Sequence, residues 1–251
     1  MPASPLIEKL LEILDDAVVE DVRVGAFWTA VVTRHGDERR CGLAATLREA
    51  EHVHGAGPSV PQAGRLIGRG ALELAQLALS SSLLDASIGI ATINALVAPP
   101  PGHWEEGNAE EVLARDGAAR KVALVGHFPF VESLRPRVAT LWVLELHPHG
   151  DDLPAEAAPQ VIPQADMLAI TATTLINGTF DGLLALRRPD ARVMLLGPSA
   201  PLSPVLFEHG VGLISGSLVE RIDPVLAAVS QGGNFRQVHR AGVRLVNISR
   251  A

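Results

Sequence analysis

The sequence has one cysteine, no excess of basic residues and no long apolar run, and each shortage excludes a class of protein. Cys41 alone permits neither an intramolecular disulfide framework nor a cysteine-rich zinc site. Lysine and arginine total 21 against 28 acidic residues, a net charge of −7 that argues against a nucleic-acid partner. Apolar stretches such as 83–97 are too short and too polar to span a membrane. The N-terminus lacks a signal-peptide apolar region, so we expect a soluble cytoplasmic protein.

The first hundred residues predict a small α+β domain within a chain of 251 residues, of which 47% are apolar. The pattern reads α-β-β-α-α, with the two strands joined as a hairpin. A sheet this small needs a partner to cover its other face. The expected segments are a helix over 5–20, strands over 21–33 and 41–46, a loop over 49–61, and helices over 67–79 and 83–97.

The Pro-Pro-Pro-Gly run at 99–102 predicts a domain boundary, because proline stops the preceding helix and stiffens the linker. We therefore expect a first domain over 1–98, a linker and connector over 99–118, and a second domain over 119–251. In the second domain, short apolar runs alternate with helical segments, which indicates a doubly wound, mostly parallel sheet. Its expected strands are 121–126, 140–147, 166–171, 192–197, 211–215 and 243–248.

Unusual chemistry follows each of the first five predicted strands of this domain, whereas the loops at the opposite edge look like ordinary turns. The carboxyl ends of parallel strands share one edge of a sheet, and ligands bind in the crevice outside it. The asymmetry therefore predicts a small-molecule site at this edge. The segments concerned are Gly126–Phe130, Glu145–Asp152, Thr171–Thr179, Gly197–Ser199 and Ser215–Ser217.

The stretch from Asp166 to Asp181 carries the densest group of polar side chains, at a predicted junction of strand and helix. Exposed amides at a helix N-terminus favour an anionic or polar ligand. Threonine is also an ordinary strand and capping residue, but the whole cluster favours a ligand site. Hydroxyls and amides are poor proton carriers at neutral pH, so any chemistry must come from elsewhere. The residues expected to bind the ligand are Thr171, Thr173, Thr174, Asn177 and Thr179.

Two residues at neighbouring strand ends are candidates for that chemistry. His127 is a candidate general acid or base because imidazole titrates near neutrality, and a structural turn histidine is the alternative. Glu145 lies 19 residues after Gly126, where an acidic residue binds ribose in a Rossmann domain, although no G-x-G-x-x-G fingerprint is present. The other residues expected to contact the ligand here are Gly126, Phe128, Gly197, Pro198 and Ser199.

Histidines and aspartates after the second strand suggest a metal site. An H-x-H pair in an extended segment puts both imidazoles on one face, which makes His147 and His149 candidates together with Asp151 and Asp152. His52 and His54 form a second such pair. Neither pair brings the third and fourth ligands of a closed zinc site, so solvated loop residues are the alternative.

Taken together, several segments resemble a bacterial and archaeal family, the putative heavy-metal chelation proteins. The resemblance implies an enolase-N-like domain, a Rossmann-like domain, and a site in the crevice between them. It also implies a distant similarity of the second domain to methyltransferases, and Ala172 stands where glycine is expected. The segments that carry it are Gly126–Pro129, Glu145, Thr171–Thr179 and Gly197–Ser199, with Gly25–Thr29, Gly42–Ala44 and Gly89–Ala95.

Three functions follow as hypotheses. The resemblance favours an enzyme that condenses, hydrolyses or transfers groups on a pterin-, flavin- or siderophore-like metabolite, with Trp28 as an apolar wall and Asn94 contributing to the crevice. Helix packing is the alternative for Asn94. The second hypothesis is a non-catalytic carrier of a metal or metal chelate. The third, an S-adenosylmethionine-dependent methyltransferase, depends on fold analogy and Glu145.

The sequence therefore leaves three candidates for the cofactor, namely a divalent metal, a nucleotide-like ligand and S-adenosylmethionine. The expected partner is a small molecule, with neither nucleic acid nor membrane. A homo-oligomer is compatible with the sequence.

Overall fold

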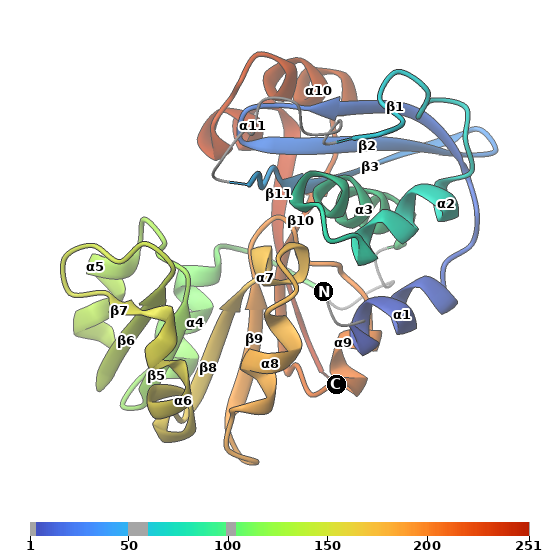
Figure 1. The fold of residues 1–251 in the computed structure, drawn as a ribbon. Coiled ribbons are helices and arrows are strands. Elements are labelled where there is room, and N and C mark those ends of the chain that lie inside the picture. Colours follow the sequence, from blue (N-terminus) through green and yellow to red (C-terminus); the bar gives the residue numbers. More distant parts are fainter. Residues whose placement is uncertain (1–3, 50–59, 99–103, 251) are drawn as a thin grey trace.

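The computed structural model of the protein describes residues 4–49, 60–98 and 104–250. It contains two sheets (Figure 1). One is a three-stranded antiparallel sheet in the order β1-β2-β3, and the other is an eight-stranded sheet in the order β4-β11-β10-β9-β8-β5-β6-β7. The fold is thus α/β, with a small antiparallel unit and a mostly parallel sheet, as the sequence predicts. The segment 99–103, which holds the Pro-Pro-Pro-Gly run of the predicted boundary, lies outside the described residues.

The N-terminal segment differs from the predicted pattern at two places. Helix α1 (Pro5–Glu12) begins at the expected residue and is capped by Ser4, but it ends well before residue 20, because the β-branched pair at 18 and 19 starts a strand. The strand predicted over 21–33 is two strands. They are separated by a turn in which Gly25 N–H donates to the Trp28 carbonyl at 2.9 Å. The strands of this sheet are β1 (Val18–Val24), β2 (Trp28–His35) and β3 (Glu38–Ala45).

Helices cover both faces of the three-stranded sheet (Figure 1). Helix α3 (Leu83–Leu96) lies on one face, with α2 (Ala71–Ala75) and the 3-10 turn η1 (Gln76–Leu79) beside it. On the other face lie α10 (Ile222–Ser230) and α11 (Phe235–Gly242), which come from the far end of the chain. Successive residues of β2 accordingly face different cores, with Val31 in the core of α3 and Val32 in that of α10. The partner that the small sheet requires is therefore supplied by the C-terminal region.

The parallel part of the large sheet has the Rossmann strand order. If β5 to β10 are counted as strands one to six, their order is 3-2-1-4-5-6, and the order reverses between β5 and β8. β11 closes this part as an antiparallel neighbour of β10. The strands are β4 (Glu105–Glu106), β5 (Lys121–Val125), β6 (Thr140–Glu145), β7 (Leu153–Pro154), β8 (Met167–Thr171), β9 (Arg192–Leu196), β10 (Leu213–Val219) and β11 (Val243–Ser249).

Helices also lie on both faces of this sheet, so it is doubly wound. α4 (Ala109–Gly117) and α5 (Val131–Leu134) share one core with it. The second core joins it to α6 (Ala158–Val161), α7 (Thr173–Ile176), α8 (Phe180–Ala185) and α9 (Val205–Glu208), and it continues into α1, α2 and α3. Apolar packing is therefore continuous between the two units. The remaining 3-10 turns are η2 (Arg135–Arg137), η3 (Ala155–Ala157) and η4 (Ile162–Gln164).

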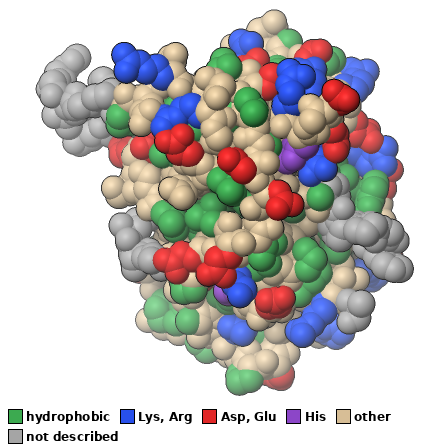
Figure 2. Space-filling model, turned by 90° about the vertical axis from the view of Figure 1, so that its right-hand side faces the viewer, with side chains coloured by type: hydrophobic (Ala, Val, Ile, Leu, Met, Phe, Trp, Pro, Cys, Tyr) green, Lys and Arg blue, Asp and Glu red, His purple; other side chains and the backbone are tan. Residues whose placement is uncertain are grey.

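Charged side chains of both signs are interspersed on the face of the molecule drawn in Figure 2, with hydrophobic groups between them. Over the described residues, no helix is long and apolar enough to cross a membrane.

Candidate functional site

A pocket of about 380 Å³ lies at the carboxyl ends of β5, β6 and β8, where the strand order reverses. Open parallel sheets bind their ligands at such a reversal, and the volume suits a small organic molecule. We call it the threonine pocket. All of its lining residues come from 125–183, so it lies at the edge of the large sheet rather than between the two units. Its polar lining consists of His127, Glu145, Thr171, Thr173, Thr174, Asn177 and Thr179, with Gly126 and Phe128 beside them.

The threonines bond largely to one another and to their own backbone. Thr174 Oγ1 donates to the Thr171 carbonyl at 2.6 Å, and Thr171 Oγ1 lies 3.1 Å from Thr173 Oγ1. Thr179 Oγ1 donates to Asn177 Oδ1 at 2.7 Å. The amide nitrogen of Asn177 makes no hydrogen bond to the described residues. The helix that was expected after β8 is only the single turn α7. The pocket therefore offers side-chain hydroxyls and an amide rather than a helix N-terminus.

The backbone of this segment needs glycine at Gly126 and Gly178 but not at Ala172. Ala172 has φ −68° and is buried, so an alanine side chain fits where the family pattern suggested glycine. Gly126 has φ +97°, and a Cβ there would meet the Thr171 side chain at 3.0 Å. Gly178 has φ +71° and turns the chain from α7 toward α8. These two glycines shape the pocket wall.

Glu145 holds the loop after β5. Its Oε2 accepts the His127 backbone N–H at 2.8 Å, and its Oε1 accepts the Leu146 N–H at 2.7 Å. Both carboxylate oxygens are thus engaged by the chain itself. The geometry therefore favours a positioning role for Glu145, which holds His127 at the mouth of the pocket. It does not favour the ribose contact that the spacing of Glu145 from Gly126 suggests.

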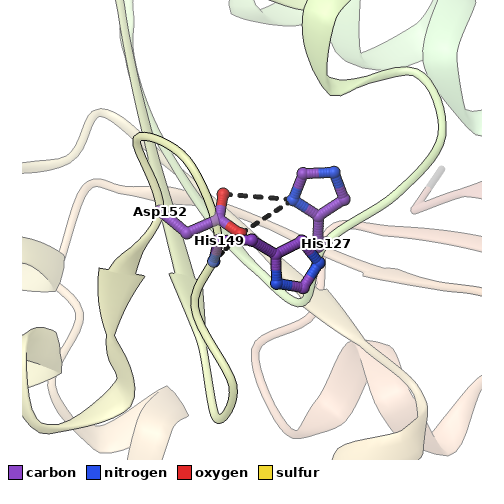
Figure 3. A group of neighbouring side chains, drawn as sticks. All are labelled: His127, His149 and Asp152. Carbon is purple, nitrogen blue, oxygen red and sulfur yellow. Dashed lines mark hydrogen bonds and ion pairs between the residues drawn. The ribbon is translucent and has the colours of Figure 1, made fainter.

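His127, His149 and Asp152 form a cluster at this mouth (Figure 3). A ring nitrogen of each histidine and a carboxylate oxygen of Asp152 lie within 4.8 Å of one another. His127 Nδ1 lies 2.9 Å and 3.1 Å from the two Asp152 oxygens, and the two imidazole rings stack with centroids 5.1 Å apart. We call this group the histidine–aspartate cluster.

A tight turn explains which residues of the 147–152 segment join the cluster. Asp152 N–H donates to the His149 carbonyl at 3.2 Å, and Gly150 at φ +61° allows the reversal. The turn brings residues 149 and 152 together and leaves Asp151 outside. His147 is also outside, because the segment is not extended, and its carbonyl lies 2.7 Å from His149 Nδ1. The metal candidates His147 and Asp151 therefore lie outside the cluster, whereas His149 and Asp152 lie in it together with His127, which was predicted as a general acid or base. His52 and His54 lie outside the described residues.

The donor atoms of the cluster suit a transition metal. A carbonyl can only accept a hydrogen bond, so His149 Nδ1 carries the proton and its Nε2 lone pair is free. Two ligands of one tetrahedral ion lie about 3.3 Å apart, close to the separation of His127 Nδ1 from Asp152. The Asp152 side chain is only 2% exposed, and no lysine or arginine in the described chain pairs with it. Burial of a carboxylate is costly unless hydrogen bonds or a cation compensate it, and the partners of Asp152 here are His127 Nδ1 and the His149 backbone N–H, at 3.3 Å.

Three of the other predicted residues line a second, larger cavity of about 570 Å³. Trp28, Gly197 and Pro198 lie there, and Phe128 lines both it and the threonine pocket. The cavity runs between the three-stranded sheet, α11 and the ends of β9 and β10. We call it the aromatic cavity. The structure therefore divides the single predicted site into two.

Asn94 and Ser199 hold the two units together. The Asn94 amide donates to the carbonyls of Leu43 and Ser199 at 2.7 and 3.1 Å. Ser199 Oγ accepts the Ala45 N–H at 2.9 Å, and its side chain is buried. These bonds join α3, β3 and the loop after β9. The alternative interpretation of Asn94, a packing contact, matches this geometry.

Replacing Asn94 by alanine should lower the free energy of unfolding by about 1–3 kcal/mol, because two buried carbonyls lose their donor. Urea denaturation measures the change. The control is Asn177→Ala, which removes a half-buried amide from the pocket wall and should cost less than about 0.5–1 kcal/mol. Equal losses in the two variants would contradict the structural role of Asn94.

Several residues in these sites were not predicted. Asp152 was named only alongside Asp151, and its inward position follows from a turn that sequence spacing does not reveal. Phe235, Arg236 and His239 line the aromatic cavity from α11, a helix that was not anticipated. A capping box at its start, in which Asn234 and Gln237 bond reciprocally, is the sequence signal that would have found it.

The fold and the sites define a two-unit α/β protein with a pocket at the carboxyl edge of a Rossmann-type sheet and a cluster of two histidines and an aspartate at its mouth. The family model DUF364, described as "Putative heavy-metal chelation", matches residues 108–247. A second model with the same description, DUF4213, matches residues 7–97. The chain belongs to this heavy-metal chelation family.

Similar proteins agree on the architecture. An uncharacterized protein of Methanocaldococcus jannaschii is 27% identical over 220 residues, which cover 84% of this chain and 83% of that protein. A crystal structure of a DUF364 protein of unknown function from Desulfitobacterium hafniense aligns with a TM-score of 0.82 and 28% identity, over 98% of this chain and 97% of that one. Another, from Pyrococcus horikoshii, has a TM-score of 0.79 at 20% identity, over 98% of both chains, and shares the fold.

Proposed function

We propose that the protein binds a divalent transition-metal ion together with a small polar metabolite that chelates it. The histidine–aspartate cluster would hold the ion, and the threonine pocket would hold the metabolite. The family's description as a heavy-metal chelation family is compatible with this role. The observation that carries the proposal is the nearly buried carboxylate of Asp152, which faces two imidazoles and has no lysine or arginine partner in the described chain.

Three protein ligands favour an open coordination site. Structural zinc sites have four protein ligands, whereas sites that bind an exogenous molecule keep a position free. His127 belongs to both the cluster and the wall of the threonine pocket, so a ligand in the pocket lies next to the ion. Imidazole nitrogens with one carboxylate suit Zn²⁺, Ni²⁺ or Co²⁺ better than Mg²⁺ or Ca²⁺. When bound, the ion would supply Lewis-acid character and a coordination point for the metabolite.

The pocket suggests the kind of metabolite. Its polar lining contains hydroxyl and amide groups but no lysine or arginine, so a neutral molecule with several oxygen or nitrogen atoms is favoured over a phosphate ester. Such a molecule could chelate metal through adjacent oxygens, as the pterin-, flavin- and siderophore-like compounds implied by the family resemblance do.

The test is the metal content of protein purified without an affinity tag, stripped with a chelator and dialysed against Zn²⁺ or Ni²⁺. We expect about one ion per chain, because the donor set is that of a single tetrahedral site. The matched control is His147→Ala, which removes a histidine of the same loop from outside the cluster and should keep the ion. Substoichiometric metal in the unaltered protein, or loss of the ion in His147→Ala, would remove the proposal.

A second candidate function is proton transfer by His127, and the short bond from His127 Nδ1 to Asp152 favours it. A carboxylate that holds Nδ1 orients the ring and leaves Nε2 to act as a general base. The protein would then be an enzyme acting on the metabolite in the pocket. The two candidates separate in His149→Ala, which removes a metal donor but leaves the Asp152–His127 pair in place.

A further inference from the structure

The aromatic cavity gathers a large share of the chain's few aromatic side chains. The sequence contains six phenylalanines, three tryptophans and no tyrosine. Four of these side chains, Trp28, Phe128, Phe130 and Phe235, line this one cavity. Phe128 and Phe130 stack with their planes 15° apart, and Trp28 contacts Phe235 at a centroid distance of 5.2 Å. The first pair lies in the loop after β5, and the second joins β2 to α11. Different parts of the fold therefore contribute aromatic surface to the cavity.

Two polar groups in this lining lack partners. The Trp28 indole nitrogen is buried and makes no hydrogen bond, although buried indole N–H groups usually find an acceptor. Arg236 is exposed at the rim and forms no ion pair with any residue that the structure describes. Glu110, the acidic residue of the lining, is already engaged by Ser133 at 2.6 Å. The indole N–H is enclosed by protein, so the polar group that the cavity itself offers is the unpaired cation of Arg236.

From these features we propose that the aromatic cavity binds a planar aromatic anion, such as an aromatic carboxylate. The ring would stack against the aromatic side chains, and the carboxylate would pair with Arg236, whose planar guanidinium suits this group. A volume of about 570 Å³ is within the range of cavities that hold small molecules. The site requires no metal and does not depend on the function proposed for the histidine–aspartate cluster.

The experiment uses the full-length, metal-stripped protein and three probes in titration calorimetry. 2-Naphthoate is a planar aromatic anion, 2-naphthamide is its neutral counterpart, and cyclohexanecarboxylate is an anion without an aromatic ring. We expect saturable binding of 2-naphthoate and affinity at least about tenfold lower for each of the other two. Binding of all three with equal affinity would overturn the proposal, as would no saturable binding of 2-naphthoate.

Variants assign the site. Arg236→Gln should weaken 2-naphthoate about tenfold, whereas Arg240→Gln, one turn further along α11 and outside the cavity lining, should leave it unchanged. Trp28→Leu should weaken both aromatic probes, and circular dichroism verifies that the variant folds. His149→Ala should have no effect. Binding that is insensitive to Arg236→Gln, or that depends on His149, would place the probe elsewhere and overturn the proposal.

Discussion

Replacing His149 by alanine should lower the affinity for Zn²⁺ or Ni²⁺ by about 100-fold or more. Loss of a residue that merely supports a metal ligand typically costs 10–100-fold, and His149 is a proposed ligand in an open site with only three. The corresponding change in binding free energy is about 2.7 kcal/mol. Competition calorimetry with a chelator of known affinity measures it. Asp152→Asn should have a similar effect, because the amide removes the negative charge that the buried position presents to the ion.

The control for this prediction lies in the same loop. His147→Ala removes an equivalent side chain two residues away that is not part of the cluster. We expect its metal affinity to stay within about twofold of the unaltered protein, since a residue that neither binds nor supports the ion contributes little. Comparable losses in His147→Ala and His149→Ala would show that the ion is held by loop histidines in general.

Replacing Gly42 by alanine should lower the free energy of unfolding by about 3 kcal/mol, at the upper end for an overpacked core. A Cβ at this position would lie 2.1 Å from the Ala91 carbonyl oxygen and 2.3 Å from the Ala95 nitrogen. These are backbone atoms of α3, so no side chain can move aside. Helix α3 would have to shift away from β3. Thermal denaturation should show a melting temperature lower by roughly 6–12 °C.

Gly182→Ala supplies the contrast. Gly182 lies within α8, and a Cβ there meets nothing within 4 Å. Alanine in a helix is more stable than glycine by roughly 0.5–1 kcal/mol, so this variant should melt at a slightly higher temperature. No loss of stability in Gly42→Ala would mean that the packing of α3 against the small sheet is not as tight as the structure has it. A loss in Gly182→Ala would contradict the open surroundings of that position in α8.

The large sheet was predictable because its strands are apolar runs separated by clear breaks. The runs at 121–126, 166–171 and 192–197 coincide with β5, β8 and β9 to within a residue. Strands buried on both faces need continuous apolar sequence, and this signal is local. The concentration of polar residues after these strands was equally visible, and it led to the residues that line the threonine pocket.

Long-range packing was not predictable in the same way. The helix expected over 5–20 continues the apolar pattern of α1 into β1, where the bridge from Val18 to Gly70 and pairing with β2 override it. The covering of the small sheet by α10 and α11 joins segments separated by most of the chain. Hence neither the aromatic cavity nor the contribution of Arg236 could follow from local patterns. Which of the two candidates Asp151 and Asp152 lies in the cluster depended on a single turn at Gly150.

The central claim, that His127, His149 and Asp152 bind one metal ion, is tested most directly by X-ray diffraction from Zn²⁺-loaded crystals. Data collected on either side of the zinc absorption edge locate the ion. The account predicts that the strongest anomalous peak lies about 2.0–2.2 Å from a nitrogen of each histidine and an oxygen of Asp152. A fully occupied zinc at other side chains, with this cluster empty, would contradict it.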